Sequence, residues 1–410
     1  MKGRSVHDDL GLFTEQAAEQ PPGDRSRARR FRQRFGRGRR RRSVSALAGV
    51  FVLVVVGGGV AYGGAQLLRV GWYADYEGPG TGEVVIQVTR GDSVSSIAST
   101  LAERDVVASS KAFRSAASDT AGVSNVQPGY YRMRSHMSGA AAAQRIVSPE
   151  AKTGEVEIRG GMRLDDQLSP NGKPTPGILS KLAQAGCTGA APGKCASPEE
   201  MKKAAATADL AQLGVPQWAI GPASKADAHR RLEGLIMPGE YSVRPGEPAQ
   251  QILQEVVTKS AGKLNKLGVA QSAQRSGHSP YEVLTIGSMA QSEAVSKDFG
   301  KVARVIENRL KQNEQLRFDS TINYPLDKPA LLTKSEDRNL PGPYNTYMNR
   351  GLPPTPISSV SEEAVKAAAN PPTGDWLFFV KCSPDGTSCF AKTQNEHNQN
   401  IKKAQQNGAY

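Results

Sequence analysis

An arginine-rich segment near the start of the chain is followed directly by a long uncharged segment. Together they separate a short N-terminal part from the rest of the chain. Arginines are dense from Arg25 to Arg42, and no charged side chain occurs over the 25 positions of residues 44–68. About 20 apolar residues suffice for a helix that crosses a bilayer. Because arginine-rich flanks stay in the cytoplasm, we predict a disordered cytoplasmic tail over 1–43, one transmembrane helix over 44–68 and an extracytoplasmic remainder. A cleaved signal peptide is the alternative, although its charged region would be unusually long.

The net charge of the chain is +13, which by itself would suggest a nucleic-acid partner. Residues 1–43 hold 13 Lys and Arg against 5 Asp and Glu, so +8 of this charge lies in the predicted tail. A basic tail beside a membrane span favours contact with anionic lipid, and we expect no nucleic-acid partner. The remaining 367 residues carry only +5, and a chain that is 38% hydrophobic has the composition for two or three folded units.

Four cysteines stand in two close pairs along the sequence, Cys187 with Cys195 and Cys382 with Cys389. Short-range pairs in an extracytoplasmic chain are typical of disulfide bonds. Apolar segments on both sides of the Pro-Asp-Gly sequence at 384–386 predict a hairpin that brings the second pair together. The five histidines show no ligand spacing to one another or to the cysteines, so we expect neither a metal site nor a cofactor.

A turn motif occurs twice after the predicted membrane span. Pro-Gly-Tyr-Tyr at 128–131 and Pro-Gly-Glu-Tyr at 238–241 lie 110 residues apart, and each follows a segment whose alternating apolar residues predict a strand. We interpret 80–150 and 151–260 as two small α/β units. The second is about 40 residues longer between its glycine turn and its Pro-Gly, and this insertion contains Cys187 and Cys195. Chance similarity of two turns is the alternative.

A domain of different character is predicted over 275–410. Ser, Pro and Glu at 279, 280 and 282 form an N-cap signature, which predicts a helix from about Pro280 to Ser296. A second helix is predicted from a cap at Asp298 through about Leu316. Loops rich in Pro, Gly, Asn and Tyr then extend to about residue 360, and loops of that length tend to line functional sites.

Glu293 is the most informative candidate for catalysis. On the first of these helices it shares the apolar face with Ile286 and Met289. An apolar setting raises the pKa of a carboxyl group, and a glutamic acid that keeps its proton near neutral pH suits a general acid that protonates a leaving oxygen. A structural ion pair with Arg304, Arg309 or an arginine of a loop is the alternative.

Other polar groups after Glu293 could complete a saccharide site. Asn308 and Arg309 could hydrogen-bond a sugar or tether a loop. Asp319 could pair with Glu293 as in glycosidases, or it could serve as a turn or helix cap. The Tyr-Asn-Thr-Tyr segment at 344–347 offers aromatic faces and amide donors that suit saccharide stacking, with plain loop scaffolding as the alternative.

The sequence resembles the YceG/MltG family of endolytic murein transglycosylases in seven ordered motifs that cover roughly residues 80–405. The motifs are Leu-Glu-Gly at 232–234 with Met237-Pro238, Ser-Met-Ala-Gln-Ser-Glu-Ala at 288–294, Lys-Val-Ala-Arg-Val-Ile-Glu-Asn-Arg-Leu at 301–310, Leu-Arg-Phe-Asp-Ser-Thr-Ile-Asn-Tyr at 316–324, Tyr-Asn-Thr-Tyr at 344–347, Gly-Leu-Pro-Pro-Thr-Pro-Ile at 351–357, and Phe-Ala-Lys-Thr with Glu-His-Asn at 390–398. This resemblance favours catalysis over a structural ion pair for Glu293.

The resemblance implies an α+β fold on a single-pass protein of the cell membrane, in which small LysM-like α/β units follow the transmembrane helix and precede an α+β catalytic domain. Glu293 matches the catalytic glutamate of the family, and many members carry a second glutamate where Gln291 stands here. Glu307, Thr355 and the insertion around Cys187 also depart from the family pattern. The implied substrate-binding residues are Asn308, Arg309, Asp319, Ser320, Thr321, Tyr324, Asn345, Thr346, Tyr347, Gly351, Leu352 and Pro353.

The implied enzyme is a lytic transglycosylase, a carbon–oxygen lyase. It would cleave the MurNAc-β-1,4-GlcNAc bond inside nascent peptidoglycan strands and form a 1,6-anhydro-MurNAc end that terminates strand elongation. Glycan strands would be its substrate, and glycan polymerases of the wall-synthesis complex its expected neighbours, although no motif names one. One alternative is a muramidase that uses Glu293 and Asp319 with water. Another is a non-catalytic glycan-binding scaffold of the same complex.

Overall fold

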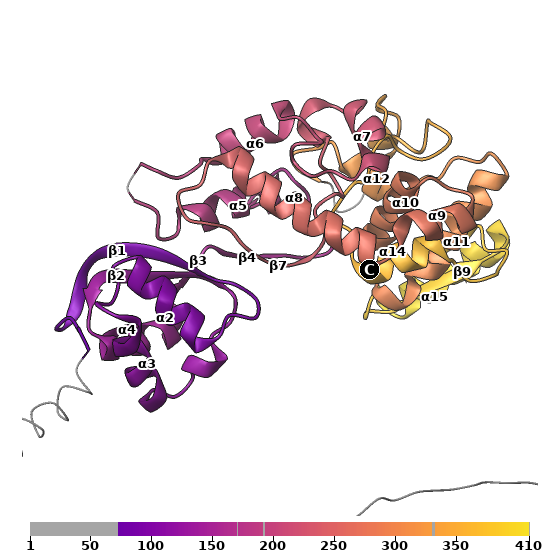
Figure 1. Ribbon diagram of the computed structural model, residues 1–410. Coiled ribbons are helices and arrows are strands. Elements are labelled where there is room, and N and C mark those ends of the chain that lie inside the picture. Colours follow the sequence, from indigo (N-terminus) through magenta and orange to yellow (C-terminus); the bar gives the residue numbers. More distant parts are fainter. Residues whose placement is uncertain (1–72, 170, 192, 330–332, 410) are drawn as a thin grey trace, which may run out of the picture. The chain divides into compact units, whose positions relative to one another are not determined.

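The computed structural model (Figure 1) describes residues 73–409 except 170, 192 and 330–332. The predicted tail over 1–43 and the predicted transmembrane helix over 44–68 lie outside these residues. Within the described part, no helix is both long enough and apolar enough to cross a bilayer. That part combines many helices with short antiparallel strands, which confirms the predicted α+β class.

The first described portion is built on a three-stranded antiparallel sheet. Its elements are β1 Pro79–Val88, α2 Val94–Glu103, α3 Ser110–Asp119, β2 Gly129–Met137, α4 Gly139–Val147 and β3 Lys152–Thr153. Strand β2 lies between β1 and β3. The three helices share a core with the sheet, in which Phe113 and Met133 are fully buried. Ser93, Ser109 and Ser138 cap the helices by accepting a backbone N–H, which explains where each helix begins.

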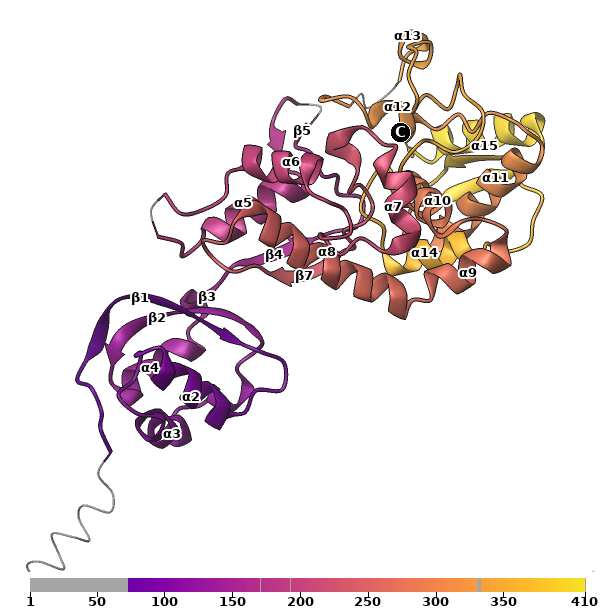
Figure 2. The same ribbon diagram turned by 45° about the horizontal axis from the view of Figure 1, so that its top comes forward.

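The next portion carries the strand pair β4 and β7. Its elements are β4 Glu155–Ile158, β5 Gln167–Leu168, β6 Pro174–Thr175, α5 Ile178–Cys187, α6 Pro198–Thr207, α7 Gln217–Ser224, β7 Gly239–Ser242, α8 Ala249–Lys266 and α9 Val269–Ser276. Helices α5, α6 and α8 pack together (Figure 2) around the buried side chains of Leu182, Met201 and Leu253. These side chains belong to a hydrophobic core that continues into the C-terminal portion.

The strand pairs of these two portions repeat the same register. In each pair the glycine of the Pro-Gly turn lies opposite the last residue of the earlier strand: Val88 with Gly129, and Ile158 with Gly239. Two residues after each glycine, a tyrosine donates its hydroxyl to the carbonyl four residues earlier, at 2.7 Å in both cases. These tyrosines are Tyr131 and Tyr241. The shared geometry is what a repeated unit would produce.

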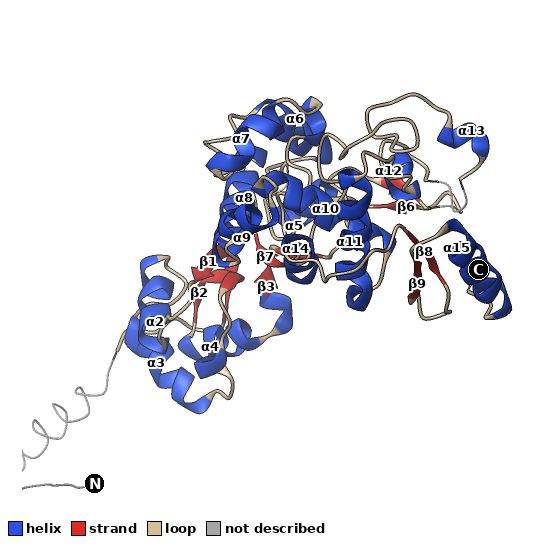
Figure 3. Cartoon of the chain, turned by 90° about the vertical axis from the view of Figure 1, so that its right-hand side faces the viewer, coloured by secondary structure: helices blue, strands red, loops and turns tan. Residues whose placement is uncertain are grey.

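The C-terminal portion is organised around α10, whose residues from Val283 to Ala290 are all buried. Its elements are α10 Pro280–Glu293, α11 Phe299–Lys311, α12 Asp319–Asn323, α13 Ser335–Arg338, α14 Glu362–Ala369, β8 Phe378–Lys381, β9 Ser388–Ala391 and α15 Gln394–Gln406. Helices α11 and α14 pack against α10, and α15 packs against the β8–β9 hairpin (Figure 3). Ser279 and Glu282 form the predicted capping box of α10.

The two helices predicted at the beginning of this portion, α10 and α11, both end earlier than predicted. α10 ends at Glu293 because Ala294 has an extended backbone. α11 ends well before its predicted limit because Asn313 takes a left-handed conformation, with φ 53°, and such a residue terminates a helix. Asp298 precedes α11 but does not cap it, since its carboxylate accepts a hydrogen bond from the Ser388 N–H at 2.8 Å instead.

The structure joins both predicted cysteine pairs, Cys187 with Cys195 and Cys382 with Cys389. The second disulfide closes the β8–β9 hairpin. Its turn contains Gly386 at φ 82°, a left-handed conformation that glycine adopts without steric cost. Asp385 accepts hydrogen bonds from the N–H and the hydroxyl of Thr387, which fixes the turn. The Pro-Asp-Gly prediction of a hairpin is therefore confirmed.

Glu307, which departs from the family pattern, has a buried partner. It lies on α11 and is 6% exposed. Its Oε1 lies 2.6 Å from Nε2 of His278, which stands just before α10. The hydrogen bond to Glu307 raises the pKa of His278. The pair therefore ties the beginning of α10 to α11.

We predict that Glu307→Gln destabilises the protein at pH 6 and has a much smaller effect at pH 9. A histidine whose pKa is raised by folding contributes stability below its ordinary pKa of 6.5 and loses that contribution as the pH rises through the raised value. Loss of the charge-assisted hydrogen bond should lower the free energy of unfolding by roughly 1–2 kcal/mol at pH 6. Denaturant unfolding at both pH values measures this, and an equal loss at both would contradict it.

Candidate active site

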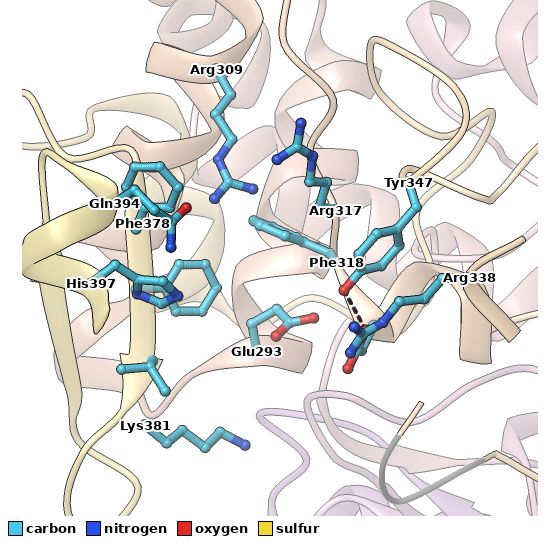
Figure 4. A pocket seen from close by; sticks show the side chains of 13 residues that line it. Glu293, Arg309, Arg317, Phe318, Arg338, Tyr347, Phe378, Lys381, Gln394 and His397 are labelled. Carbon is cyan, nitrogen blue, oxygen red and sulfur yellow. Dashed lines mark hydrogen bonds and ion pairs between the residues drawn. The ribbon is translucent and has the colours of Figure 1, made fainter. Parts of the chain in front are cut away.

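Glu293 is the last residue of α10, so its side chain leaves the core where the helix ends. Ile286 and Met289, which share its helix face, are fully buried, whereas Glu293 is half-buried. Its carboxylate lines a cavity of about 470 Å³ (Figure 4). The apolar face of α10 thus holds a titratable group at the edge of a cavity.

The walls of this cavity come from segments that lie far apart in the sequence. One wall is formed by α11 and the beginning of α12, a second by α13 and the loop after it, and a third by the hairpin and α15. The lining residues are Glu293, Arg309, Arg317, Phe318, Asp319, Arg338, Tyr347, Phe378, Phe379, Val380, Lys381, Gln394 and His397. Three of the predicted substrate-binding residues, Arg309, Asp319 and Tyr347, are therefore brought together with Glu293.

A backbone hydrogen bond orients the Glu293 carboxylate. The N–H of Ser320 donates to its Oε1 at 3.1 Å. Burial raises the pKa of Glu293, hydrogen bonding by Ser320 opposes this rise, and the charge of Asp319 adds to it. A carboxyl group with a raised pKa holds its proton closer to neutral pH, as a general acid must.

The ion-pair alternative for Glu293 is not found in the structure. Arg309 donates to the carbonyls of Leu316 and Leu377. Arg304 donates to two carbonyls of the loop that follows α14. Among the residues that the structure describes, no cation is close enough to Glu293 to form an ion pair. Both arginines are thus committed to the backbone.

Gln291, which stands where many family members have a second glutamate, has a structural role. Its Oε1 accepts a hydrogen bond from the N–H of Ser361 at 3.2 Å, at the beginning of α14. It does not line the cavity that holds Glu293. The side chain at this position therefore contributes nothing to the lining of the cavity.

Asp319, the predicted second carboxylate, lines the cavity, and its carboxylate already has a hydrogen bond and an ion pair within the protein. The hydroxyl of Tyr347 donates to its Oδ1 at 2.6 Å, and Nε of Arg338 lies 3.6 Å from the same oxygen. The guanidinium of Arg338 also lies over the ring of Tyr347, 5.1 Å from its centre. Burial, together with the bond to Asp319, holds the pKa of Tyr347 above its ordinary value. The arrangement suits a positioning role for Asp319 better than proton transfer.

Aromatic rings form the hairpin side of the cavity. Phe378 stacks on the ring of His397, with centroids 5.3 Å apart and planes at 24°. Phe318 meets Phe379 edge-on at 5.5 Å. Nδ1 of His397 is buried and has no hydrogen-bond partner in the described part of the chain, and burial lowers the pKa of this histidine. Uncharged ring faces of this kind suit the apolar face of a sugar ring.

Sequence reasoning missed this hairpin side and the basic residues near it. Arg317, Lys381 and Gln394 line the cavity. Lys381 and Gln394 belong to none of the quoted motifs, and Arg317 lies within the motif at 316–324 but was not predicted to bind substrate. Lys381 directly precedes a cysteine, and its place depends on how the hairpin folds back toward α10. Arg317 has φ 55°, which the sequence does not reveal. A structure was needed to find these three residues.

Several predicted substrate ligands instead hold loops behind the cavity wall. Asn308 donates to two carbonyls of the loop before β8, at 3.0 and 2.9 Å. Thr321 and Thr346 are fully buried and hydrogen-bond each other at 2.8 Å. Asn345 donates to the carbonyls of residues 338 and 340. None of these four side chains lines the Glu293 cavity.

Gly351, Leu352 and Pro353 line a different cavity, of about 570 Å³. Its other walls include His278 and Glu282, at the beginning of α10. Because Glu293 stands at the opposite end of that helix, the structure does not bring this predicted group together with it.

A second buried carboxyl group supports the segment that carries Ser320. Glu233, in the Leu-Glu-Gly motif, is 2% exposed and accepts hydrogen bonds from the Tyr324 hydroxyl at 2.9 Å and the Leu164 N–H at 3.3 Å. Tyr324 directly follows α12, whose second residue, Ser320, contacts Glu293. Burial raises the pKa of Glu233 to about 7. Tyr324, predicted as a substrate ligand, is thus an internal support of the site.

We predict that Glu233→Gln weakens the pH dependence of stability. A carboxyl group whose pKa rises from 4.5 to about 7 on folding keeps its proton in the folded chain after the unfolded chain has released it. Its contribution is therefore full below pH 4.5 and is lost as the pH rises through 7. At about 1.4 kcal/mol per pKa unit, the loss is roughly 3 kcal/mol. Glutamine cannot ionise but can accept both hydrogen bonds, so this loss should be absent from the variant.

Denaturant unfolding of the wild type and Glu233→Gln at pH 5 and pH 8 tests this expectation. Glu103→Gln is the matched control, because Glu103 is an exposed carboxylate on α2. It should show the wild-type pH dependence. If the two variants behave alike, the titration of Glu233 does not contribute to stability.

Comparison with known proteins reveals relatives of this chain. The sequence pattern of the YceG-like family matches residues 86–403. A protein of Bacillus subtilis named endolytic murein transglycosylase is 28% identical over 361 residues, which cover 84% of this chain and 89% of that protein. A protein of the same name from Streptococcus pneumoniae is 30% identical over 187 residues, which cover 44% of this chain and 33% of that protein.

Among solved structures, the fold is similar to that of a yceG-like protein from Listeria monocytogenes, a crystal structure at 2.6 Å. The TM-score is 0.50 at 23% sequence identity, and the match covers 78% of this chain and 99% of the other. This similarity concerns the fold alone. The family pattern, in contrast, extends over most of the sequence, from the first strand to the last helix, and the chain therefore belongs to the YceG-like family.

Proposed function

We propose that the protein is an endolytic murein transglycosylase, which cleaves MurNAc-β-1,4-GlcNAc bonds within peptidoglycan strands and leaves 1,6-anhydro-MurNAc ends. The observation that carries this proposal is the setting of Glu293. Its carboxyl group lines an open cavity, has a raised pKa and forms no ion pair within the described part of the chain. The relatives named endolytic murein transglycosylase support the same activity.

One carboxyl group is sufficient for this reaction. Protonated Glu293 gives its proton to the glycosidic oxygen, the bond from that oxygen to C1 of MurNAc breaks, and GlcNAc leaves with a free 4-hydroxyl group. Positive charge develops at C1 as in other glycosidases. The Glu293 carboxylate then takes the proton of the MurNAc 6-hydroxyl as O6 bonds to C1. The proton returns to Glu293, and no water is consumed.

The contacts of the carboxylate fit both halves of this cycle. The Ser320 N–H that binds Oε1 stabilises the charged form after the first proton transfer. Burial favours the protonated form before it. Burial and the Ser320 hydrogen bond thus shift the pKa of Glu293 in opposite directions, and each favours one of the two protonation states that a group serving first as acid and then as base must adopt.

A muramidase remains the competing function, because Asp319 lines the same cavity. In a hydrolase of that kind, the second carboxylate must receive a water proton or attack the sugar. Asp319 is instead held by Tyr347 and Arg338. This engagement favours the transglycosylase.

We further propose that the arginine-rich tail over 1–43 lies in the cytoplasm, that residues 44–68 anchor the chain in the cell membrane, and that the cavity lies outside. The two disulfides support an oxidising location for the cavity. In this arrangement the LysM-like units proposed for 80–150 and 151–260 follow the membrane anchor along the chain. An enzyme that ends new strands would work beside the glycan polymerases that make them.

We predict that the full-length protein in detergent releases internal 1,6-anhydro ends from uncrosslinked peptidoglycan strands, and that Glu293→Gln does not. Loss of the general acid should lower kcat by about 10²–10⁴-fold. Mass spectrometry of the products measures both the rate and the type of end. Asp319→Asn should keep anhydro products, because the proposed cycle does not use its charge for proton transfer.

Each alternative gives a different product pattern. Free reducing ends from the wild type would establish the muramidase. Intact strands with both the wild type and Glu293→Gln would favour the glycan-binding scaffold. Circular dichroism of Glu293→Gln should match that of the wild type, so that a loss of product is not a loss of fold.

A further inference from the structure

The cavity around Glu293 holds more positive than negative charge. Four cations, Arg309, Arg317, Arg338 and Lys381, line it together with two carboxyl groups, Glu293 and Asp319. Gathering like charges in one cavity costs free energy unless partners compensate for it. The hydrogen bonds and ion pairs of each cation therefore show whether it stabilises the fold or is available to bind a ligand.

Two of the four cations are committed to the fold. Arg309 donates hydrogen bonds to the carbonyls of Leu316 and Leu377. Arg338 donates to the hydroxyl of Thr333 at 3.0 Å and pairs with Asp319. Removing either arginine would leave unsatisfied backbone or carboxylate groups, so their presence is explained by the protein itself.

Arg317 and Lys381 have no such explanation. Both are exposed to solvent. Among the residues that the structure describes, neither side chain has a hydrogen bond, an ion pair or a ring contact. Burial and the charge of Arg317 together lower the pKa of Arg309 to about 10. Burial already disfavours the charged form of Arg309, and the positive charge of Arg317 disfavours it further.

The backbone of Arg317 has a strained conformation at this position beside the cavity. Its φ of 55° lies in the left-handed region, which is strained for a residue with a side chain. A hydrogen bond from its N–H to the carbonyl of Thr346, at 3.0 Å, fixes the conformation. Strained positions of this kind concentrate at functional sites.

The two free cations lie on different sides of Glu293. In Figure 4 Arg317 stands near Arg309 and Phe318, whereas Lys381 extends from the hairpin on the other side of the Glu293 carboxylate. A ligand whose reacting bond lies at Glu293 could therefore present an anionic group in either direction.

We infer that Arg317 and Lys381 form a subsite for carboxylate groups that MurNAc residues carry, so that the enzyme selects charged strands over strands whose carboxyl groups are masked. This inference rests on the proposed function. The sugar backbone of peptidoglycan is uncharged, and its negative charge comes from groups attached to the lactyl ether of MurNAc. Because MurNAc is the sugar whose C1 reacts, those groups lie next to the cleaved bond. Arginine and lysine are the usual partners of carboxylates in such sites.

The carboxylate that the subsite binds could come from two parts of the strand, and substrates that carry only one of them distinguish the two. Intact strands carry carboxylates on their stem peptides, while the carboxyl group of the lactyl ether forms an amide bond with the peptide. Strands from which an amidase has removed the peptides carry a free lactyl carboxylate instead. Strands with stem carboxyl groups converted to amides keep their size but lose the charge.

The test measures kcat/KM of the full-length protein in detergent on these three kinds of uncrosslinked strand. The wild type should cleave intact strands about tenfold faster than amidated ones, as expected for one or two charge-assisted hydrogen bonds. In the double variant Arg317→Gln with Lys381→Gln, this ratio should fall to near one. Arg90→Gln and Lys402→Gln remove exposed charges outside the cavity and should keep the wild-type ratio.

The strands without peptides identify the source of the carboxylate. If the wild type cleaves intact strands faster than amidated ones, the subsite binds a stem carboxylate. If it cleaves those two equally but cleaves strands without peptides faster, the subsite binds the lactyl carboxylate. Equal cleavage of all three kinds of strand by the wild type would overturn the inference and leave the proposed function standing. So would an unchanged ratio in the double variant. Failure of the wild type to cleave any strand would instead overturn the proposed function and this inference with it.

Discussion

The burial of α10 is the constraint on which the site depends. Residues 283–290 are buried on every side of this helix and pack against α11 and α14. The helix therefore cannot slide or rotate without opening the core. Glu293 stands at its very end, so a rigid apolar element sets the position of the carboxyl group that we propose as the acid. Precise placement of an acid requires this kind of support.

The contact between Glu233 and Tyr324 supports the site from a different part of the chain. Tyr324 anchors the end of α12, and the beginning of α12 offers the Ser320 N–H to Glu293. The Leu-Glu-Gly motif thus lies far from Glu293 in sequence yet helps to hold the group that orients it. One continuous hydrophobic core includes both the neighbours of Glu233 and those of Glu293. Glu293 and the residues that support its position are therefore coupled through packing.

Local patterns were enough to predict the elements but not the cavity. The capping box at Ser279, the Pro-Asp-Gly turn and the apolar face that leads to Glu293 each depend on neighbours within a few residues. Arg317 and Lys381 line the cavity only because a left-handed residue and a folded-back hairpin bring them there. Asn308, Thr321 and Asn345 lie in recognisable motifs, yet their hydrogen bonds are to loops. A motif alone does not distinguish a ligand of the substrate from a support of the fold.

The hairpin that forms one side of the cavity is closed by a covalent bond beside Lys381. Phe378 and Lys381 are on its first strand, and the Cys382–Cys389 bond holds that strand to the second. Thiols of this kind stay reduced in the cytosol. With the extracytoplasmic location proposed above, the bond that closes this hairpin would form only after the chain reaches an oxidising compartment. Under that proposal, one side of the cavity gains its covalent support in the compartment that holds the peptidoglycan rather than where the chain is synthesised.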